Sequence, residues 1–155
     1  MKRKLKLNRI ILGGILLGSL SIFGVPLMIT HKVCPIGGEE FKDSYVPQCP
    51  TNKFVMFKNE FTEEELKKYE KIINSEEYRE IPRNSNKYYY LARFYEMLGG
   101  ISDKEIGKTY FNSYHYYSEN KETKREALQK GISYLEKAEK KDYEVMWKLA
   151  NLYSE

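Results

Sequence analysis

Helix start signals recur along this chain after residue 60 and restrict its fold more than any other feature. In FTEEEL, Thr62 stands three residues before Glu65, the spacing of a capping box, in which each side chain accepts a hydrogen bond from the other residue's backbone N–H. Ser102 and Glu105 repeat this spacing in ISDKEI. The sequence therefore predicts that a helix begins at each of these two points.

Hydrophobic residues at helical spacing extend the helical prediction over the rest of the C-terminal part. The expected helices cover residues 62–74, 86–98, 103–118 and 123–142 and a last segment ending near residue 153, with a short helical turn at 75–79. A strand signal appears only around the two cysteines and in KFVMFK, residues 53–58. Helix is therefore expected to dominate the structure.

Two of the helical segments share a Leu-Ala-x-x-Tyr motif, formed by Leu91, Ala92 and Tyr95 and again by Leu149, Ala150 and Tyr153. The motif resembles the first helix of a tetratricopeptide (TPR) repeat, and GISYLEKAEKKD, residues 131–142, resembles the second helix. The two motifs lie 58 residues apart, which is not a multiple of the usual repeat of about 34 residues. We therefore expect an irregular TPR-like helical array, with an ordinary helical bundle as the alternative.

The N-terminus carries a different signal. Five basic residues within the first nine positions precede the uncharged run IILGGILLGSLSIFGVPLMI, residues 10–29. Twenty residues at about 1.5 Å each span roughly 30 Å, the thickness of a bilayer's hydrocarbon core. The pattern predicts an uncleaved membrane anchor at residues 1–30 with its N-terminus in the cytoplasm. A cleaved signal peptide is the alternative.

The expected fold class is therefore all-α. An N-terminal transmembrane helix is followed by a short cysteine-containing loop or hairpin at residues 31–58 and a TPR-like helical domain at 59–155. The expected location is the bacterial cytoplasmic membrane, crossed once, with the C-terminal domain extracytoplasmic, or secreted if the signal is cleaved. Without the five N-terminal cations, the net charge of +4 falls to 21 basic against 22 acidic residues. A nucleic-acid partner is therefore not expected.

The chain has two cysteines, Cys34 and Cys49, each followed by proline. A disulfide between them would close a loop and stabilise a small domain by about 3 kcal/mol. The alternatives are free thiols and a metal site in which His31, Cys34, Cys49 and either His115 or a carboxylate supply the four ligands that zinc prefers. Because thiols outside the cytoplasm tend to be oxidised, the sequence favours the disulfide and no cofactor.

Three segments, CPIGGEEF, CPTNKFVMFKNEFTEEELKKYEKIINSEEYREI and YYYLARFYEMLGG, together resemble an uncharacterised bacterial family, a domain of unknown function. Its members have two Cys-Pro-x-Cys-Gly knuckles, as in a zinc ribbon, followed by a TPR-like helical tail. The resemblance implies that Cys34 and Cys49 are the first cysteines of the two knuckles. Gly37 and Asn52 stand where the second cysteines would be, so the resemblance also implies that the family's zinc site is degenerate here.

The sequence contains no nucleophile elbow, phosphate loop or HExxH motif, so no catalytic residues and no enzymatic activity are expected. The expected function is that of a membrane-anchored extracytoplasmic interaction or scaffold protein. Tyr88, Tyr95 and Tyr114 are expected to line a groove between helices that holds a protein or peptide partner. A small metal-binding or thiol protein built on the Cys-Pro turns is the alternative.

Overall fold

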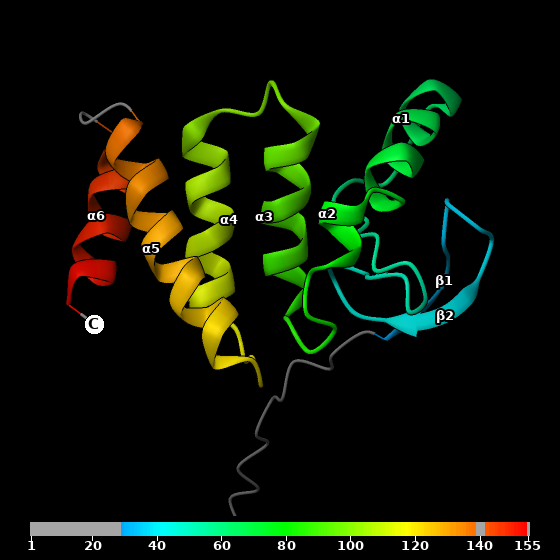
Figure 1. The fold of residues 1–155 in the computed structure, drawn as a ribbon, viewed down its shortest axis with the longest axis horizontal. Coiled ribbons are helices and arrows are strands. Elements are labelled where there is room, and N and C mark those ends of the chain that lie inside the picture. The colour runs from blue at the N-terminus through cyan, green and yellow to red at the C-terminus, as the bar shows by residue number, and fades with distance from the viewer. Residues whose placement is uncertain (1–28, 139–141, 155) are drawn as a thin grey trace, which may run out of the picture.

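The computed structural model describes residues 29–138 and 142–154 of the 155-residue chain, and these residues form six helices and one two-stranded sheet (Figure 1). The elements follow in the order β1 (Thr30–Val33), β2 (Glu40–Asp43), α1 (Glu63–Ile73), α2 (Glu76–Arg79), α3 (Lys87–Leu98), α4 (Asp103–His115), α5 (Lys121–Lys137) and α6 (Tyr143–Tyr153). Helices α3 to α6 form a row in which neighbours run antiparallel (Figure 1). Helix α6 is at one end of the molecule, and the sheet and α1 are at the opposite end.

A hydrophobic core centred on Phe54 joins the cysteine-containing segment to the helices. The Phe54 side chain is fully buried. Its ring centroid lies 6.0 Å from that of Tyr69 in α1 and 5.7 Å from that of Phe94 in α3. Strands β1 and β2, which are antiparallel, precede this segment. The sheet and turns therefore belong to the same packed unit as α1 and α3.

A network of charged and tyrosine side chains joins α3 to α5. Glu96 of α3 pairs with Arg93 at 3.2 Å and with Lys130 of α5 at 3.0 Å. Tyr89 Oη donates a hydrogen bond of 2.6 Å to Glu126 Oε2 in α5. Burial alone would raise the pKa of Glu126, but the hydrogen bonds from Tyr89 and Lys130 lower it. The two helices on either side of α4 are thus held to each other directly.

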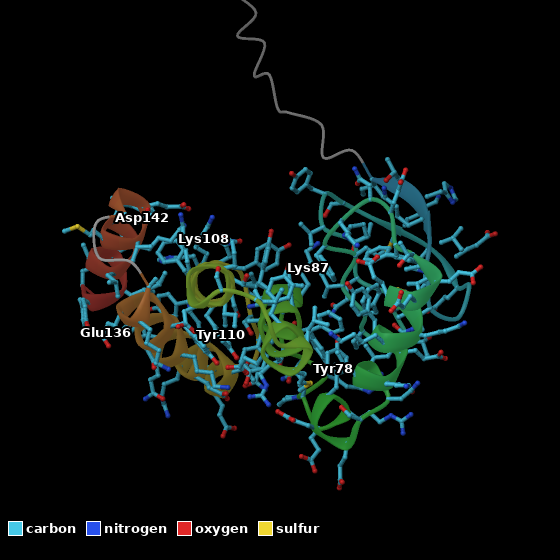
Figure 2. The ribbon with its side chains drawn as sticks, turned by 90° about the horizontal axis from the view of Figure 1, so that it is seen from above. Tyr78, Lys87, Lys108, Tyr110, Glu136 and Asp142 are labelled. Carbon is cyan, nitrogen blue, oxygen red and sulfur yellow. A yellow bond between two sulfur atoms is a disulfide. The ribbon has the colours of Figure 1, made fainter. Side chains whose placement is uncertain are left out.

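Helix α6 packs on α4 and α5 through one face. Val145 and Leu152 are buried on that face. Lys104 Nζ of α4 lies 2.5 Å from Asp142 Oδ2, and Asp142 is the N-cap residue of α6. Lys108 of α4 lies on the same side of the molecule as Asp142 (Figure 2). Charge pairing at the start of α6 and apolar packing along it therefore fix the helix in the row.

Local capping explains where the helices begin. Thr62 Oγ1 accepts a hydrogen bond of 3.2 Å from Glu65 N, and Thr62 N donates one of 2.9 Å to Glu65 Oε2. The predicted capping box is confirmed. At the start of α4, Ser102 Oγ accepts a hydrogen bond of 3.3 Å from Glu105 N. Both helices begin within one residue of the predicted position.

We expect Thr62→Ala to lower the free energy of unfolding by about 1 kcal/mol, because an N-cap hydroxyl satisfies a backbone N–H that alanine leaves unpaired. Equilibrium unfolding in urea measures the change. Ser133→Ala removes an exposed hydroxyl from the interior of α5 and is the matched control. Its effect is expected to stay within about 0.5 kcal/mol. Equal effects of the two variants would contradict a capping role for Thr62.

Three local predictions are wrong. The helix expected over residues 123–142 ends at Lys137, because Ala138 adopts extended dihedral angles (φ −69°, ψ 168°). Residues 53–58 form no strand, and Val55 makes only an isolated bridge. Because Phe54 and Val55 are consecutive and both buried, the segment lacks the alternating burial of a half-exposed strand. Helix α4 ends at His115, three residues earlier than expected, because Tyr116 adopts extended dihedral angles (φ −80°, ψ 147°).

The prediction of a transmembrane helix also needs correction. Within residues 29–138 and 142–154, no helix is both long enough and apolar enough to cross a bilayer. The longest, α5, has 17 residues, eight of them charged in KETKREALQKGISYLEK. The expected anchor, residues 1–30, falls almost entirely on residues 1–28, which lie outside the described part. The fold class is corrected to a mostly helical protein with a small sheet, and the predicted single-pass, signal-anchored location in the bacterial cytoplasmic membrane is unsupported.

Candidate functional site

The two Cys-Pro segments fold into two turns of the same kind. Cys34 N donates a hydrogen bond of 2.8 Å to the carbonyl oxygen five residues later, and its own carbonyl accepts one of 3.1 Å from the N–H four residues later. Cys49 makes the same two bonds, of 2.8 and 3.0 Å. The fifth residue of each turn, Gly38 and Lys53, has a positive φ of 72° and 62°. The turns are therefore matched in backbone geometry although their sequences differ.

A disulfide joins the two turns. Cys34 and Cys49 have Cα atoms 5.6 Å apart and are both almost fully buried. This bond is compatible with an oxidising compartment. It occupies the thiolates that a zinc site would need.

Gly37 and Asn52, each three residues after a cysteine, lie beside the disulfide. A Cβ atom on Gly37 would lie 4.0 Å from Asn52 Nδ2, so the two positions face each other. The φ of Gly37 is +100°, a conformation that side chains rarely adopt. Asn52 Nδ2 donates a hydrogen bond of 2.7 Å to Ile36 O, and Asn52 Oδ1 accepts one of 2.9 Å from Phe54 N. Asn52 therefore links the two turns through hydrogen bonds.

The structure does not assemble the metal site considered as an alternative. Among the described residues, no three histidine, cysteine or acidic side chains form a group that could hold a metal ion. His31 is exposed in β1, and the His115 ring packs on Phe111 in α4 with centroids 4.4 Å apart. The two cysteines are bonded to each other. The set of His31, Cys34, Cys49 and His115 is therefore not brought together.

The three tyrosines expected to line a groove pack on three different neighbours. The Tyr88 ring lies 5.1 Å from Tyr116, and the Tyr95 ring lies 5.5 Å from Phe57. The Tyr114 ring lies under Lys124 Nζ at 5.0 Å. All three side chains are half-buried, so much of their surface serves the packing of the helices.

Helix α6 carries a row of exposed apolar side chains, two of which also contact α4 and α5 at one edge. Met146, Trp147 and Tyr153 are 58%, 51% and 60% exposed, and Ala150 is also exposed. Spacings of three and four residues place Met146, Ala150 and Tyr153 on one side of the helix, with Trp147 at its edge. We call these four residues the α6 face.

The shared Leu-Ala-x-x-Tyr motif allows α6 to be compared with α3. Ala92 of α3 is fully buried, whereas Ala150 at the same motif position is exposed. Two positions earlier than Leu-Ala, Tyr89 of α3 is 4% exposed and Trp147 of α6 is 51% exposed. Tyr89 is covered because its ring packs at 6.1 Å from Tyr110 in α4. Among the described residues, no following helix covers α6 in the same way.

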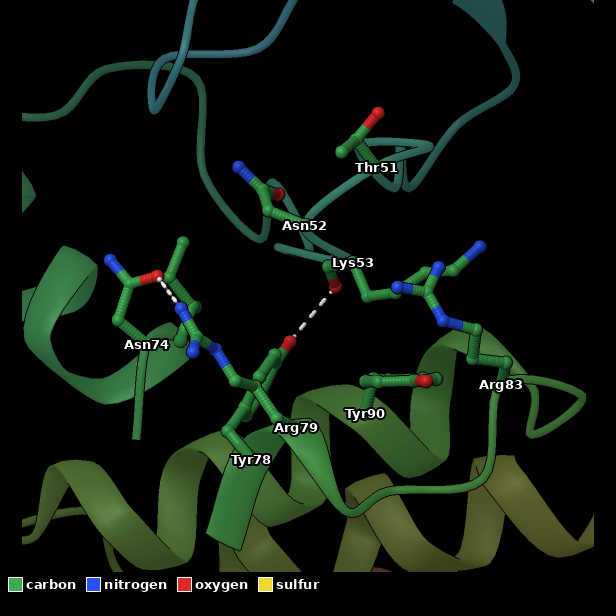
Figure 3. Close-up of a pocket in the computed structure, with 9 residues that line it drawn as sticks. Thr51, Asn52, Lys53, Asn74, Tyr78, Arg79, Arg83 and Tyr90 are labelled. Carbon is green, nitrogen blue, oxygen red and sulfur yellow. Dashed lines mark hydrogen bonds between the residues drawn. The ribbon is translucent and has the colours of Figure 1, made fainter. Parts of the chain in front are cut away.

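A cavity of about 340 Å³ lies between the second cysteine turn and helices α1 and α2. Lys53 of the turn, Arg79 at the end of α2 and Arg83 in the next loop bring three positive charges to it. None of its nine lining residues is acidic. Figure 3 shows Arg79 on one side and Lys53 and Arg83 on the other, with the rings of Tyr78 and Tyr90 between them. We call this the basic cavity.

The tyrosine hydroxyls of the basic cavity are bound to backbone carbonyl groups. Tyr78 Oη donates a hydrogen bond of 2.8 Å to Lys53 O, and Tyr90 Oη donates one of 3.2 Å to Ile81 O. Burial raises the pKa of Tyr78 and of Tyr90, although Arg83 opposes the rise at Tyr90. Both phenols therefore stay neutral at physiological pH, and the cavity keeps a positive charge.

The basic cavity did not emerge from the sequence, because its cations come from separate segments. Lys53 belongs to the turn after Cys49, whereas Arg79 and Arg83 follow α1 by several residues. The pair Arg79 and Arg83, four residues apart around Pro82, was the local signal that could have pointed to it. Only the packing of the turn on α1 and α2 brings the three charges together.

Comparison with known proteins finds no matching family, no matching characterised relative and no matching solved structure. The resemblance to a zinc-ribbon family and to tetratricopeptide repeats, the lack of enzymatic activity and the absence of a nucleic-acid partner therefore stay predictions. The functional argument rests on the α6 face and the basic cavity.

Proposed function

We propose that the chain is a protein-interaction module whose α6 face binds an amphipathic helix of a partner protein. The observation that supports this proposal is the contrast in burial between α3 and α6 at equivalent motif positions, Ala92 against Ala150 and Tyr89 against Trp147. A row of large apolar side chains left open on one face is typical of an interaction surface.

The occupant is inferred from what covers α3. In α3, the position equivalent to Trp147 packs against the next helix, α4, which runs antiparallel to α3 (Figure 1). In an array of stacked helices, each helix buries its apolar face on its neighbours. A helix that lies along α6 as α4 lies along α3 would bury the α6 face in the same manner. Its contact residues would be apolar and spaced three and four residues apart.

Trp147 and Tyr153 are the side chains that should carry most of the binding energy. Tryptophan and tyrosine are enriched among the residues that dominate protein interfaces. Both are anchored at one edge, since the Trp147 ring packs on Phe111 at 5.8 Å and the Tyr153 hydroxyl donates to Glu136 of α5. Anchored rings lose little conformational freedom when a partner binds.

Site-specific photo-crosslinking tests the proposal. A photoreactive residue is placed at Ala150 of the full chain in the cells that produce it, and at Gln129, an exposed residue of α5, as the matched control. We expect Ala150 to crosslink one partner protein at residues spaced three and four apart in a helix. A synthetic peptide of that helix should bind the purified chain, and Trp147→Ala should weaken binding roughly 30-fold. Gln129→Ala should leave it unchanged.

Three results would overturn the proposal. The first is the same crosslinks from Gln129 as from Ala150. The second is a peptide affinity that Trp147→Ala does not change. The third is crosslinking only to a second copy of the chain, together with a dimeric mass in light scattering, which would assign the α6 face to self-association.

A further inference from the structure

The basic cavity has the composition of an anion-binding site and is separate from the α6 face. Its cations stand on two sides of a central space, Arg79 opposite Lys53 and Arg83 (Figure 3). Arginine offers a planar fork of N–H donors that binds two oxygens of an oxyanion at once. Two arginines from different sides can therefore bind different pairs of oxygens on one tetrahedral group.

The arrangement of Arg79 is set by a neutral partner. Arg79 Nη2 donates a hydrogen bond of 2.8 Å to Asn74 Oδ1, the C-cap residue of α1. An amide oxygen orients the guanidinium without cancelling its charge. The nearby carboxylate of Glu39 instead accepts hydrogen bonds of 3.1 Å from Thr51 N and Thr51 Oγ1, at the rim of the cavity. Glu39 brings one negative charge near the three positive charges of the cavity, so the net charge there is positive.

Part of the remaining wall is apolar. Ile73 of α1 and the rings of Tyr78 and Tyr90 form this part, and the two hydroxyls are already bound to backbone carbonyls. The other lining residues, Thr51, Asn52 and Asn74, are polar and uncharged. The volume of about 340 Å³ exceeds what a single small anion fills. The cavity therefore offers cations on two sides and an apolar surface between them within one space.

We propose that the basic cavity binds a phosphate monoester whose organic part is aromatic or apolar. Arg79, Arg83 and Lys53 bind the phosphate group, and the organic part packs on Ile73 and the two tyrosine rings. A dianion with three terminal oxygens suits three cations on two sides better than a carboxylate, which has a single charge and two oxygens. The proposal uses residues remote from α6, so it does not rest on the proposed partner helix.

Calorimetric titration of the full chain at low ionic strength tests this site with three probes: phenyl phosphate, inorganic phosphate and benzoate. We expect phenyl phosphate to bind at least tenfold more tightly than either of the others. Inorganic phosphate lacks the aromatic part, and benzoate lacks the tetrahedral dianion, so each comparison isolates one half of the site. Binding should weaken as salt is added.

Charge-removing variants locate the binding. Arg79→Gln and Arg83→Gln are each expected to raise the Kd for phenyl phosphate at least tenfold. Arg125→Gln removes an exposed arginine from α5 and is the matched control, expected to leave the Kd within twofold. Arg83→Lys keeps the charge but loses the fork, so its Kd should fall between those of the wild type and Arg83→Gln. Arg79 and Arg83 are exposed, so the variants should unfold at the wild-type temperature.

The proposal is overturned if none of the probes binds at millimolar concentration, or if Arg125→Gln weakens binding as much as the cavity variants. Equal affinity for inorganic phosphate and phenyl phosphate would exclude the apolar part of the site. Equal affinity for benzoate and phenyl phosphate would make it a carboxylate site and contradict the phosphate assignment.

Discussion

Replacing both cysteines, Cys34→Ala with Cys49→Ala, is expected to lower the free energy of unfolding by about 3 kcal/mol. The disulfide closes a loop over a sequence separation of 15 residues, so its loss restores chain entropy to the unfolded state. Both side chains are almost fully buried in the same core cluster as Phe54, so removing the disulfide also removes packing contacts from the main core.

Urea unfolding with and without a reductant measures this effect. The wild type should lose stability when the reductant is present and approach the double variant, whereas the double variant should not respond to it. A single variant, Cys34→Ala, leaves a free thiol on Cys49 and should behave like the double variant. If the wild type and the double variant unfold at the same urea concentration without reductant, the disulfide contributes nothing to stability and the expectation is wrong.

Gly107→Ala is expected to destabilise the protein by about 2 kcal/mol, the second large effect. A Cβ atom at this position in α4 would lie 2.7 Å from Leu135 Cγ and 3.0 Å from Leu135 N. The backbone N cannot move unless α5 moves, and Leu135 is fully buried. This overpacking should exceed the gain of about 1 kcal/mol that alanine brings to a helix interior. Thermal or urea unfolding measures the resulting change in the free energy of unfolding.

Gly131→Ala is the matched control. Its Cβ atom would lie 3.2 Å from Leu152 Cδ1, the end of a flexible side chain, and 3.5 Å from Tyr110 Cβ. We expect this variant to stay within about 1 kcal/mol of the wild type. In a Leu135→Ala background, Gly107→Ala should cost less than it does alone, because the two nearest atoms, Leu135 Cγ and Cδ2, are gone and only the contact with Leu135 N remains. Equal costs in the two backgrounds would show that the Leu135 side chain does not contribute to the overpacking.

The helix boundaries were predictable because they depend on neighbouring residues. Thr62 and Ser102 accept hydrogen bonds from the N–H three residues later, and Gly99 takes a positive φ of 68° where α3 ends. These interactions lie within a few residues of chain, so the sequence displays them directly. The early end of α4 at Tyr116 has no comparable local signal, which is why periodicity extended the helix too far.

The candidate sites were harder to predict because they depend on packing between distant segments. Whether Trp147 is core or surface is decided by the presence of a covering helix, not by its own motif, and the equivalent Tyr89 is buried. Lys53 has a positive φ, which is unusual for a residue other than glycine. The sequence gives no sign of this conformation, which follows from the fold of the turn. The residue types were visible in the sequence, but their neighbours were not.

The row of helices gives the molecule two ends with different chemistry. Helix α6, which carries the α6 face, stands at one end of the molecule, and α1 and α2 stand toward the other (Figure 1). The basic cavity lies between the second cysteine turn and these two helices. Helices α3, α4 and α5 stand between α6 and these two helices, so a ligand at one end does not obstruct the other. With both proposed ligands bound, a rigid spacer of this kind would hold them at a fixed separation and raise the effective concentration of one near the other. In that case, binding at one end would position what is held at the other.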